Sequence, residues 1–297
     1  MGNSTEQHVM GASYILTVLL FTPIYIRIIY IFCSRLKYRI VKCYQIMIQM
    51  GLIQCLMAPG FFFFGLAQLL DNDFMGIAKF LVKAGLVGTT AEAFLGLVLA
   101  LNRVVVITGL YVPNAVFSAL QVLAVILYLT YYGVRLSLIG DVVVTPGKYI
   151  VKTNLTLPVA KTWSTFCGVF LQTILFATFF LYLALSGYVL YSRYSKSSLA
   201  NVKKEMNIIL YAGIRFVIDL SLTMVFHYVK LPKHRFMEVI QYLAYMINSL
   251  VVASLLHLVV NRGLRRDFFG QHRFSNVTPV ASMKTTSTHE SKFKGSS

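Results

Sequence analysis

In this 297-residue chain, the charged side chains inside apolar stretches are the residues best suited to carry chemistry. Glu92, Arg215 and Asp219 lie far from the ends of such stretches, where a charge in a membrane-spanning helix costs about 2.5 to 3.5 kcal/mol. Arg215 and Asp219 are four residues apart, so they can pair on one helical face and offset that cost. We expect these three residues and Asn248 to form an interior polar network, and a purely structural ion pair is the alternative.

Arg103 follows Asn102 at the end of the third apolar stretch. Glu92 precedes Arg103 by eleven residues, which places the two side chains within about 20° of one helical face. If Arg103 faces the interior, Glu92 faces it too. Five other charged residues lie nearer the ends of their stretches, and we expect each to extend its charge toward the membrane surface, or snorkel: Lys79, Lys83, Arg135, Glu238 and Arg27.

Signatures of catalysis and of metal binding are missing. The four cysteines lie in or beside apolar stretches and form no CxxC pair, and the six histidines show no metal-ligand spacing. No nucleophile motif of a hydrolase is present. We therefore expect no enzyme, no catalytic residue, no metal and no cofactor.

Composition determines the elements that must position these residues. Apolar residues make up 57% of the chain, charged residues 12%, and the mean hydropathy is +0.71, which is typical of a protein that crosses the membrane several times. Because lipid offers the backbone no hydrogen bonds, the spans must be helices. We expect seven, at about residues 11–33, 44–70, 76–107, 114–139, 163–191, 206–229 and 236–260. No parallel or inverted repeat is apparent, which weakens the interpretation as a carrier.

The distribution of Lys and Arg over the short loops predicts an amino terminus outside the cell. Residues 1–10 then form an extracellular segment, residues 11–269 the helical bundle, and residues 270–297 a cytoplasmic tail. Two glycosylation sequons, at Asn3 and Asn154, fall outside, whereas a third at Asn276 falls in the tail. The net charge of +17 is spread over loops, which favours contact with anionic lipid over nucleic acid.

Three segments resemble those of the nematode serpentine chemoreceptors, with class T (Srt) the most similar class. They are residues 44–51 at the start of the second span, residues 99–103 at the end of the third, and residues 261–269 after the seventh. The resemblance implies a bundle like that of G-protein-coupled receptors, an extracellular chemical ligand and a heterotrimeric G protein as partner. It implies that Arg103, with Asn102, meets the G protein, and that residues 264–269, with Arg265 and Arg266, begin a short interfacial helix.

The chain departs from the broader receptor pattern in three ways. The cysteines of the usual outer disulfide are absent, and no proline interrupts the sixth or seventh span. Where many such receptors carry an acid in the second span, this chain has Gln54, while Glu92 adds an acid to the third. We include Gln54 in the expected network.

A ligand pocket in a helical bundle lies between the outer halves of the helices. We expect it to involve Gly85, Thr89 and Glu92 of the third span, His227 of the sixth, and Tyr242 and Met246 of the seventh. Ordinary core packing is the alternative for each of them. The seventh span contains no lysine that could bind retinal.

Residues 271–297 are polar and rich in Ser and Thr, which predicts disorder. Such a tail suits phosphorylation and binding of arrestin, and a plain solvated terminus is the alternative. The expected location is the plasma membrane, with the sensory cilium as a candidate compartment. The chain is thus interpreted as a chemosensory receptor that activates a G protein, and the main alternative is a seven-helix carrier or ligand-gated channel whose polar path uses Glu92, Arg215 and Asp219. A structural membrane protein with an inert Arg103 is a third interpretation.

Overall fold

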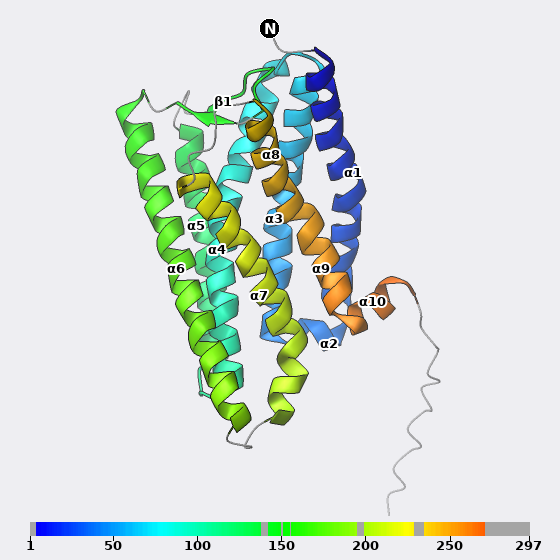
Figure 1. Ribbon diagram of the computed structural model, residues 1–297, viewed down its shortest axis with the longest axis vertical. Coiled ribbons are helices and arrows are strands. Elements are labelled where there is room, and N and C mark those ends of the chain that lie inside the picture. The colour runs from blue at the N-terminus through cyan, green and yellow to red at the C-terminus, as the bar shows by residue number, and fades with distance from the viewer. Residues whose placement is uncertain are drawn as a thin grey trace, which may run out of the picture.

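Long apolar runs fold into long helices that lie side by side, and together they form the antiparallel bundle seen in Figure 1. The computed structural model describes residues 4–137, 142–149, 151–154, 156–194, 199–228 and 235–270. Among these residues, six helices are long and apolar enough to cross a membrane. A further helix, α7, packs against α4, α6 and α9 in the position of the sixth predicted span. The all-helical membrane bundle expected from composition is confirmed.

Each predicted span corresponds to a helix. The long helices are α1 (Ser4–Ser34), α3 (Lys42–Leu69), α4 (Ile77–Thr108), α5 (Asn114–Ser137), α6 (Pro158–Tyr194) and α7 (Leu199–Tyr228). The seventh span consists of three consecutive pieces, α8 (Arg235–Met246), the π-helical turn η2 (Ile247–Val252) and α9 (Ala253–Val260). The short elements are α2 (Leu36–Arg39), the 3-10 turn η1 (Phe74–Gly76), α10 (Arg262–Phe268) and the strands β1 (Val142–Val143) and β2 (Lys152–Thr153), which pair antiparallel.

The two ends of the bundle are built differently. The β1–β2 hairpin lies at the end where α1 begins, which we call the amino-terminal end, and α2 and α10 lie at the opposite, tail end (Figure 1). The helix α1 starts at Ser4, well before the apolar span begins. Its first turns are held by Gln7, whose Nε2 donates to the carbonyl of Gln68 at 2.9 Å and to Oδ1 of Asp71 at 3.0 Å.

The helix α4 occupies the middle of the bundle and packs against α3, α5, α6 and α7. Small residues bring the neighbouring helices close: a Cβ on Gly60 of α3 would lie 2.8 Å from the carbonyl oxygen of Leu81, and one on Gly11 of α1 would lie 2.7 Å from that of Gly65. Close approach at small residues is a common way for helices to associate in membranes. The main core, which includes Tyr14, Met57, Phe64, Leu95 and Leu250, therefore forms around α3 and α4.

Lys83 and Arg135 contradict the snorkelling prediction. Lys83 is 5% exposed and Arg135 is 7% exposed, and the Lys83 ammonium donates to the backbone carbonyl of Arg135 at 2.6 Å. The prediction was wrong for both because the face of α4 that carries Lys83 is covered by α5. Arg27 is exposed as expected, and it donates to the carbonyl of Phe268 at 2.7 Å from a position over that ring, so it fastens α1 to α10.

The α-helix of the seventh span is interrupted without a proline. Residues 247–252 form a π-helical turn, in which the backbone is wider than in an α-helix and such turns often occur at functional sites. Asn248, Ser249 and Leu250 of this turn are buried. The turn therefore interrupts the α-helix of the span where the sequence has no proline to do so, and its buried residues face the interior of the bundle.

Candidate functional site

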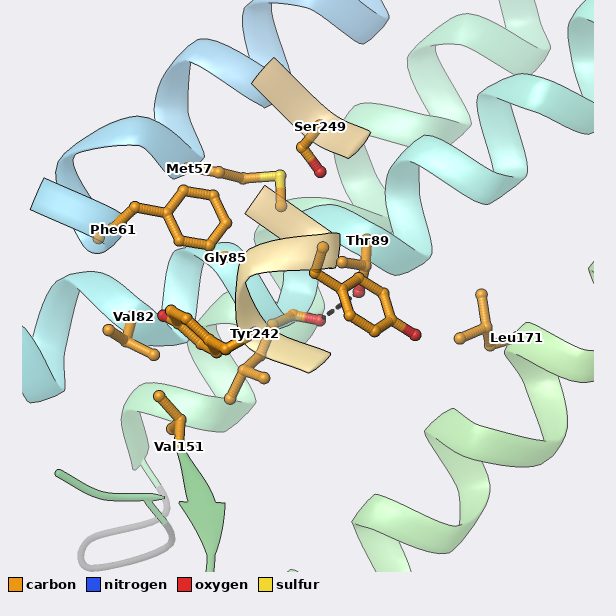
Figure 2. A pocket seen from close by; sticks show the side chains of 12 residues that line it. Met57, Phe61, Val82, Gly85, Thr89, Val151, Leu171, Tyr242 and Ser249 are labelled. Atoms are coloured by element: carbon orange, nitrogen blue, oxygen red, sulfur yellow. Dashed lines mark hydrogen bonds between the residues drawn. The ribbon is translucent and has the colours of Figure 1, made fainter. Parts of the chain in front are cut away.

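A cavity of about 220 Å³ lies between α3, α4, α6 and α8 in the half of the bundle nearer the amino-terminal end (Figures 1 and 2). Most of its wall is apolar, with Met57 and Phe61 from α3, Val82 and Leu86 from α4, and Leu171 from α6. Four of its lining residues carry a side-chain hydroxyl: Thr89, Tyr242, Tyr245 and Ser249. The cavity therefore suits a molecule with a largely apolar body.

The structure places three of the six predicted ligand residues, Gly85, Thr89 and Tyr242, on the wall of this cavity. A Cβ added to Gly85 would meet nothing within 4 Å, so the missing side chain leaves room for the cavity. Met246 instead lies fully buried in the main core. The side chain of His227 is outside the described part of the chain.

Aromatic packing holds Tyr242 at the cavity wall. Its ring lies 4.6 Å from that of Phe64, 5.4 Å from that of Tyr14 and 5.7 Å from that of Phe61, measured between ring centroids. Tyr245 and Ser249, which sequence reasoning missed, lie three and seven residues after Tyr242 and so share its helical face. That periodicity was a signal that could have identified them.

A second cavity of about 60 Å³ continues from the first toward the centre of the bundle. Both cavities are lined by Thr89, Leu171, Tyr245 and Ser249. The second is also lined by Glu92, Asp219 and Asn248. The predicted ligand residue Glu92 therefore lies one turn of α4 deeper than Thr89, where the apolar cavity meets charged groups.

Arg215 of α7 is the centre of the buried polar network. Its Nη2 donates to Oε1 of Glu92 on α4, and its Nη1 donates to the backbone carbonyl of Asn248 and, at 3.0 Å, to Oδ1 of the same residue. Its Nε lies 3.3 Å from Oδ2 of Asp219. Asn248 returns a bond from Nδ2 to Oδ1 of Asp219 at 2.6 Å. One guanidinium thus joins α4, α7 and the π-helical turn.

Two neutral residues extend the network to α3 and α1. Nε2 of Gln54 donates to Oε1 of Glu92, and the hydroxyl of Tyr25 donates to Oε1 of Gln54. Gln54 is 1% exposed and Tyr25 1% exposed, so both bonds are shielded from solvent. The structure therefore brings all five predicted network residues together and adds Tyr25, whose position in α1 gave no sign of this role.

Arg103 lies eleven residues further along α4 than Glu92, or about 16 Å toward the tail end. It is 1% exposed, and its Nη2 donates to Oδ1 of Asn102 at 2.6 Å. Both residues are buried between helices, so in this conformation the bundle covers the guanidinium. Access to Arg103 from the tail end requires movement of a neighbouring helix.

The short helix α10 is fastened to the tail end of the bundle. Oδ1 of Asn261 accepts from the backbone N–H of Leu264 at 3.0 Å and caps the helix, and Leu264 is fully buried. Asp267 accepts from the Lys37 ammonium at 2.6 Å and from the Tyr38 hydroxyl at 3.0 Å. Arg265 and Arg266 are exposed, so their charges are available to a membrane surface or a partner.

Burial on its own raises the pKa of Asp267, but hydrogen bonds from Lys37 and Tyr38 and the charge of Lys37 outweigh it, so its pKa lies below the ordinary value of 3.8. Burial and the bond to Asp267 raise the pKa of Tyr38. Asp267 is therefore ionised and Tyr38 is neutral at neutral pH.

A pair of glutamines holds the loop that covers the amino-terminal end of the cavity. Gln68 of α3 is fully buried, its Nε2 donates to the carbonyl of Lys148 at 3.1 Å, and its Oε1 accepts from the N–H of Gly147 at 3.0 Å. Gln7 supports the backbone of Gln68 from α1. The same loop places Val151 on the cavity wall. These bonds tie the loop to the bundle in a chain without the outer disulfide.

Of the two predicted glycosylation sites, Asn154 is described and Asn3 lies outside the described residues. Oδ1 of Asn154 accepts from the N–H of Thr156 at 3.2 Å and from its hydroxyl at 2.7 Å. Asn154 is partly buried and Thr156 is exposed. The predicted disordered tail, apart from Gly270, also lies outside the described residues.

Comparison with known proteins shows the fold. No protein-family model matches the sequence, and no curated protein matches it. Among solved structures, the chain is similar to the crystal structure of squid rhodopsin, with a TM-score of 0.62 over 91% of this chain and 85% of that one, at 9% sequence identity. At this identity the likeness is one of architecture, and it confirms the predicted bundle of the kind found in G-protein-coupled receptors.

Proposed function

We propose that this chain is a chemosensory-type G-protein-coupled receptor that binds an extracellular small molecule in the 220 Å³ cavity and activates a heterotrimeric G protein. The observation that carries the proposal is the continuity of this cavity with the Arg215 network through Thr89 and Ser249. The rhodopsin-like fold supports it. So does the resemblance of three segments to the nematode class T chemoreceptors.

The network supplies a physical route from ligand to helix movement. Ser249 touches the cavity, and its neighbour Asn248 bonds Arg215 and Asp219 on α7. A ligand that displaces the π-helical turn must therefore stretch or exchange the bonds that hold this turn to Arg215 on α7, and Arg215 in turn bonds Glu92 on α4. A ligand shifts the equilibrium between two arrangements of the helices only by as much as it binds one of them more tightly. The buried bonds of the network give these two arrangements different free energies.

The burial of Arg103 makes this conformation the closed one under the proposal. Movement of α6 or α7 away from α4 would expose the guanidinium and the amide of Asn102 to the G protein. An arginine suits this role because it stays charged and offers five N–H donors to backbone carbonyls. Arg265 and Arg266 on α10 would add surface charge beside the same opening.

The proposal includes the membrane topology. The amino terminus faces outside, so Asn3 and Asn154 are available for glycosylation, and the protein resides in the plasma membrane with the sensory cilium as a candidate compartment. The basic tail end faces anionic lipid of the inner leaflet. The Ser- and Thr-rich tail is a substrate for kinases and a partner for arrestin.

The decisive test uses a cell-based G-protein readout to screen small volatile and secreted molecules on the parent chain and on Arg103→Ala. The parent should respond to at least one molecule, and the variant should reach the surface in equal amount and lose the response. Nucleotide exchange on purified Gα should follow the same pattern. A variant that signals normally at equal surface level would remove Arg103 from the mechanism.

A carrier or ligand-gated channel is the second candidate. It is favoured by a third cavity of about 30 Å³ that continues past Glu92 and Asp219 to Arg215 and Tyr211, which together with the first two forms a series along the bundle. Uptake or current in membranes that lack G proteins, without nucleotide exchange on Gα, would support this candidate against the receptor.

A further inference from the structure

The 220 Å³ cavity and the 60 Å³ cavity differ in the polarity of their walls. The 220 Å³ cavity is surrounded mainly by carbon, with the rings of Phe61, Tyr242 and Tyr245 among its walls. The 60 Å³ cavity beneath it meets Glu92, Asp219 and Asn248. A single ligand that fills both must place an apolar body outward and a polar group inward.

Carboxyl groups outnumber cations at the deep end. Arg215 faces the carboxyl groups of both Glu92 and Asp219. Oε1 of Glu92 already accepts from both Gln54 and Arg215. Among the described residues, both carboxyl groups line the deep cavity, whereas Arg215 does not.

Asp219 is the carboxylate with remaining capacity. Asn248 donates to one oxygen at 2.6 Å, and Arg215 approaches the other only to 3.3 Å. Its side chain is 29% exposed, compared with 7% for that of Glu92. A carboxylate can accept about four hydrogen bonds, so Asp219 can accept a further donor from a molecule in the cavity that it lines.

Ser249 offers a second polar group beside Asp219. The residue is 2% exposed and lines both cavities, and Figure 2 shows its side chain among those that surround the open space. Its hydroxyl is therefore a polar group at the junction of the two cavities. A hydroxyl can both donate and accept a hydrogen bond, so a ligand that reaches the deep cavity can bond to it.

We propose that the ligand is a small molecule with a mainly apolar body and a protonated amine at one end. The ammonium donates to the Asp219 carboxylate and to the Ser249 hydroxyl, and the body lies against the rings of Tyr242 and Tyr245. This inference rests on the proposed use of the cavity as the ligand site.

Two features support an amine over other end groups, and a third limits the size of the ligand. An ammonium forms a charge-assisted hydrogen bond with the Asp219 carboxylate, whereas a ligand carboxylate would offer that acceptor no donor. Aromatic faces also attract a cation within about 6 Å of the ring centre. The combined space is below the roughly 300 to 1,000 Å³ of pockets for drug-sized ligands, so the molecule is small.

The test uses three probes with one skeleton: 2-phenylethylamine, 2-phenylethanol and phenylacetate. Binding to the purified full-length receptor in lipid nanodiscs is measured without G protein, from the shift in unfolding temperature with probe concentration. A charge-assisted hydrogen bond is about twice as strong as a neutral one. The amine should therefore bind roughly tenfold more tightly than the alcohol, or about 1.4 kcal/mol, and the acid should not bind.

Two variants separate charge from hydrogen bonding. Asp219→Asn keeps the shape and an acceptor for Asn248 but removes the charge, so the preference for the amine over the alcohol should fall to less than about threefold. Ser249→Ala keeps the charge, so it should weaken amine and alcohol by similar factors and preserve the preference.

An amine that binds no more tightly than the alcohol on the parent protein overturns the inference, and so does an amine that does not bind at all. This comparison needs no variant, so it stands even if Asp219→Asn does not fold. Amine binding without nucleotide exchange on Gα would sustain the ligand class and reject the receptor function. Nucleotide exchange on Gα that is driven by a neutral molecule in this cavity would sustain the receptor function and reject the ligand class.

Discussion

Replacement of Arg215 by methionine tests whether the buried network is held by charge balance. The substitution keeps a long side chain but leaves Glu92 and Asp219 facing each other without a cation, and it removes the donor to the carbonyl of Asn248. Removing one partner of a buried ion pair costs about 3 to 5 kcal/mol. For a chain of this size that corresponds to a fall in unfolding temperature of roughly 6 to 20 °C.

The triple variant Arg215→Met, Glu92→Gln, Asp219→Asn sharpens the test. It removes both uncompensated carboxylates while it keeps their shapes, so it should recover more than half of the stability that the single substitution loses. Gln54 can still donate to the amide oxygen at position 92, as it does to Oε1 of Glu92. The triple variant should therefore unfold at a temperature between those of the single variant and the parent.

Thermal unfolding of the parent, both variants and a matched control in one detergent is the assay. Lys37→Met is the control, because it also removes a cation from an ion pair, but one in which the lysine side chain is 49% exposed and the Asp267 side chain is 4% exposed. Solvent reaches the cation of this pair, and the Tyr38 hydroxyl still donates to Asp267 in the variant, so the loss should be nearer the roughly 0 to 1 kcal/mol of exposed pairs. If Arg215→Met unfolds within about 1 °C of the control, or the triple variant is no more stable than the single one, the charge-balance reasoning fails.

Three further predictions concern the cavity, its loop and α10. A Cβ at Gly85 would meet no atom within 4 Å, so Gly85→Leu should fill part of the cavity and raise the half-maximal concentration of any activating molecule at least roughly tenfold. The control, Gly133→Leu on the exposed face of α5, should leave that concentration unchanged. Dose–response curves at equal surface level test both expectations. Gln68→Leu should free the loop from α3, so trypsin should cleave after Lys148 roughly tenfold faster; an unchanged rate on gels would show that other contacts hold the loop. Because the pKa of Asp267 is lowered in the folded protein, its stabilisation of α10 is fully present above pH 3.8 and is lost as the pH falls through the folded-state pKa. Hydrogen exchange of the α10 backbone should therefore speed up in that pH range. The variant Asp267→Asn should show no such increase.

Periodicity and charge were sufficient to place several site residues. The eleven-residue spacing of Glu92 and Arg103 predicted one shared face, and both side chains are buried. The four-residue spacing of Arg215 and Asp219 predicted a pair along one helix, and that pair forms. Both predictions depend only on the geometry of a single helix, which the sequence specifies locally.

Lys83 shows where this local reasoning stops. Its position near the end of a span predicted that it would reach the membrane surface, yet it is buried against α5. Which face of a central helix is covered depends on the neighbours that pack there. The sequence of residues 76–107 by itself therefore cannot predict which face of this helix is covered.

The sequence by itself determined the class of protein, the helices and the cost of each buried charge, because these follow from composition, helical periodicity and the absence of water in lipid. Only the tertiary structure decided that Arg215 bonds Glu92, 123 residues away, that Tyr25 joins them through Gln54, and that a π-helical turn brings Asn248 and Ser249 to the cavity. These contacts join segments distant in sequence. They form where helices pack, so the pattern of one helix cannot specify them.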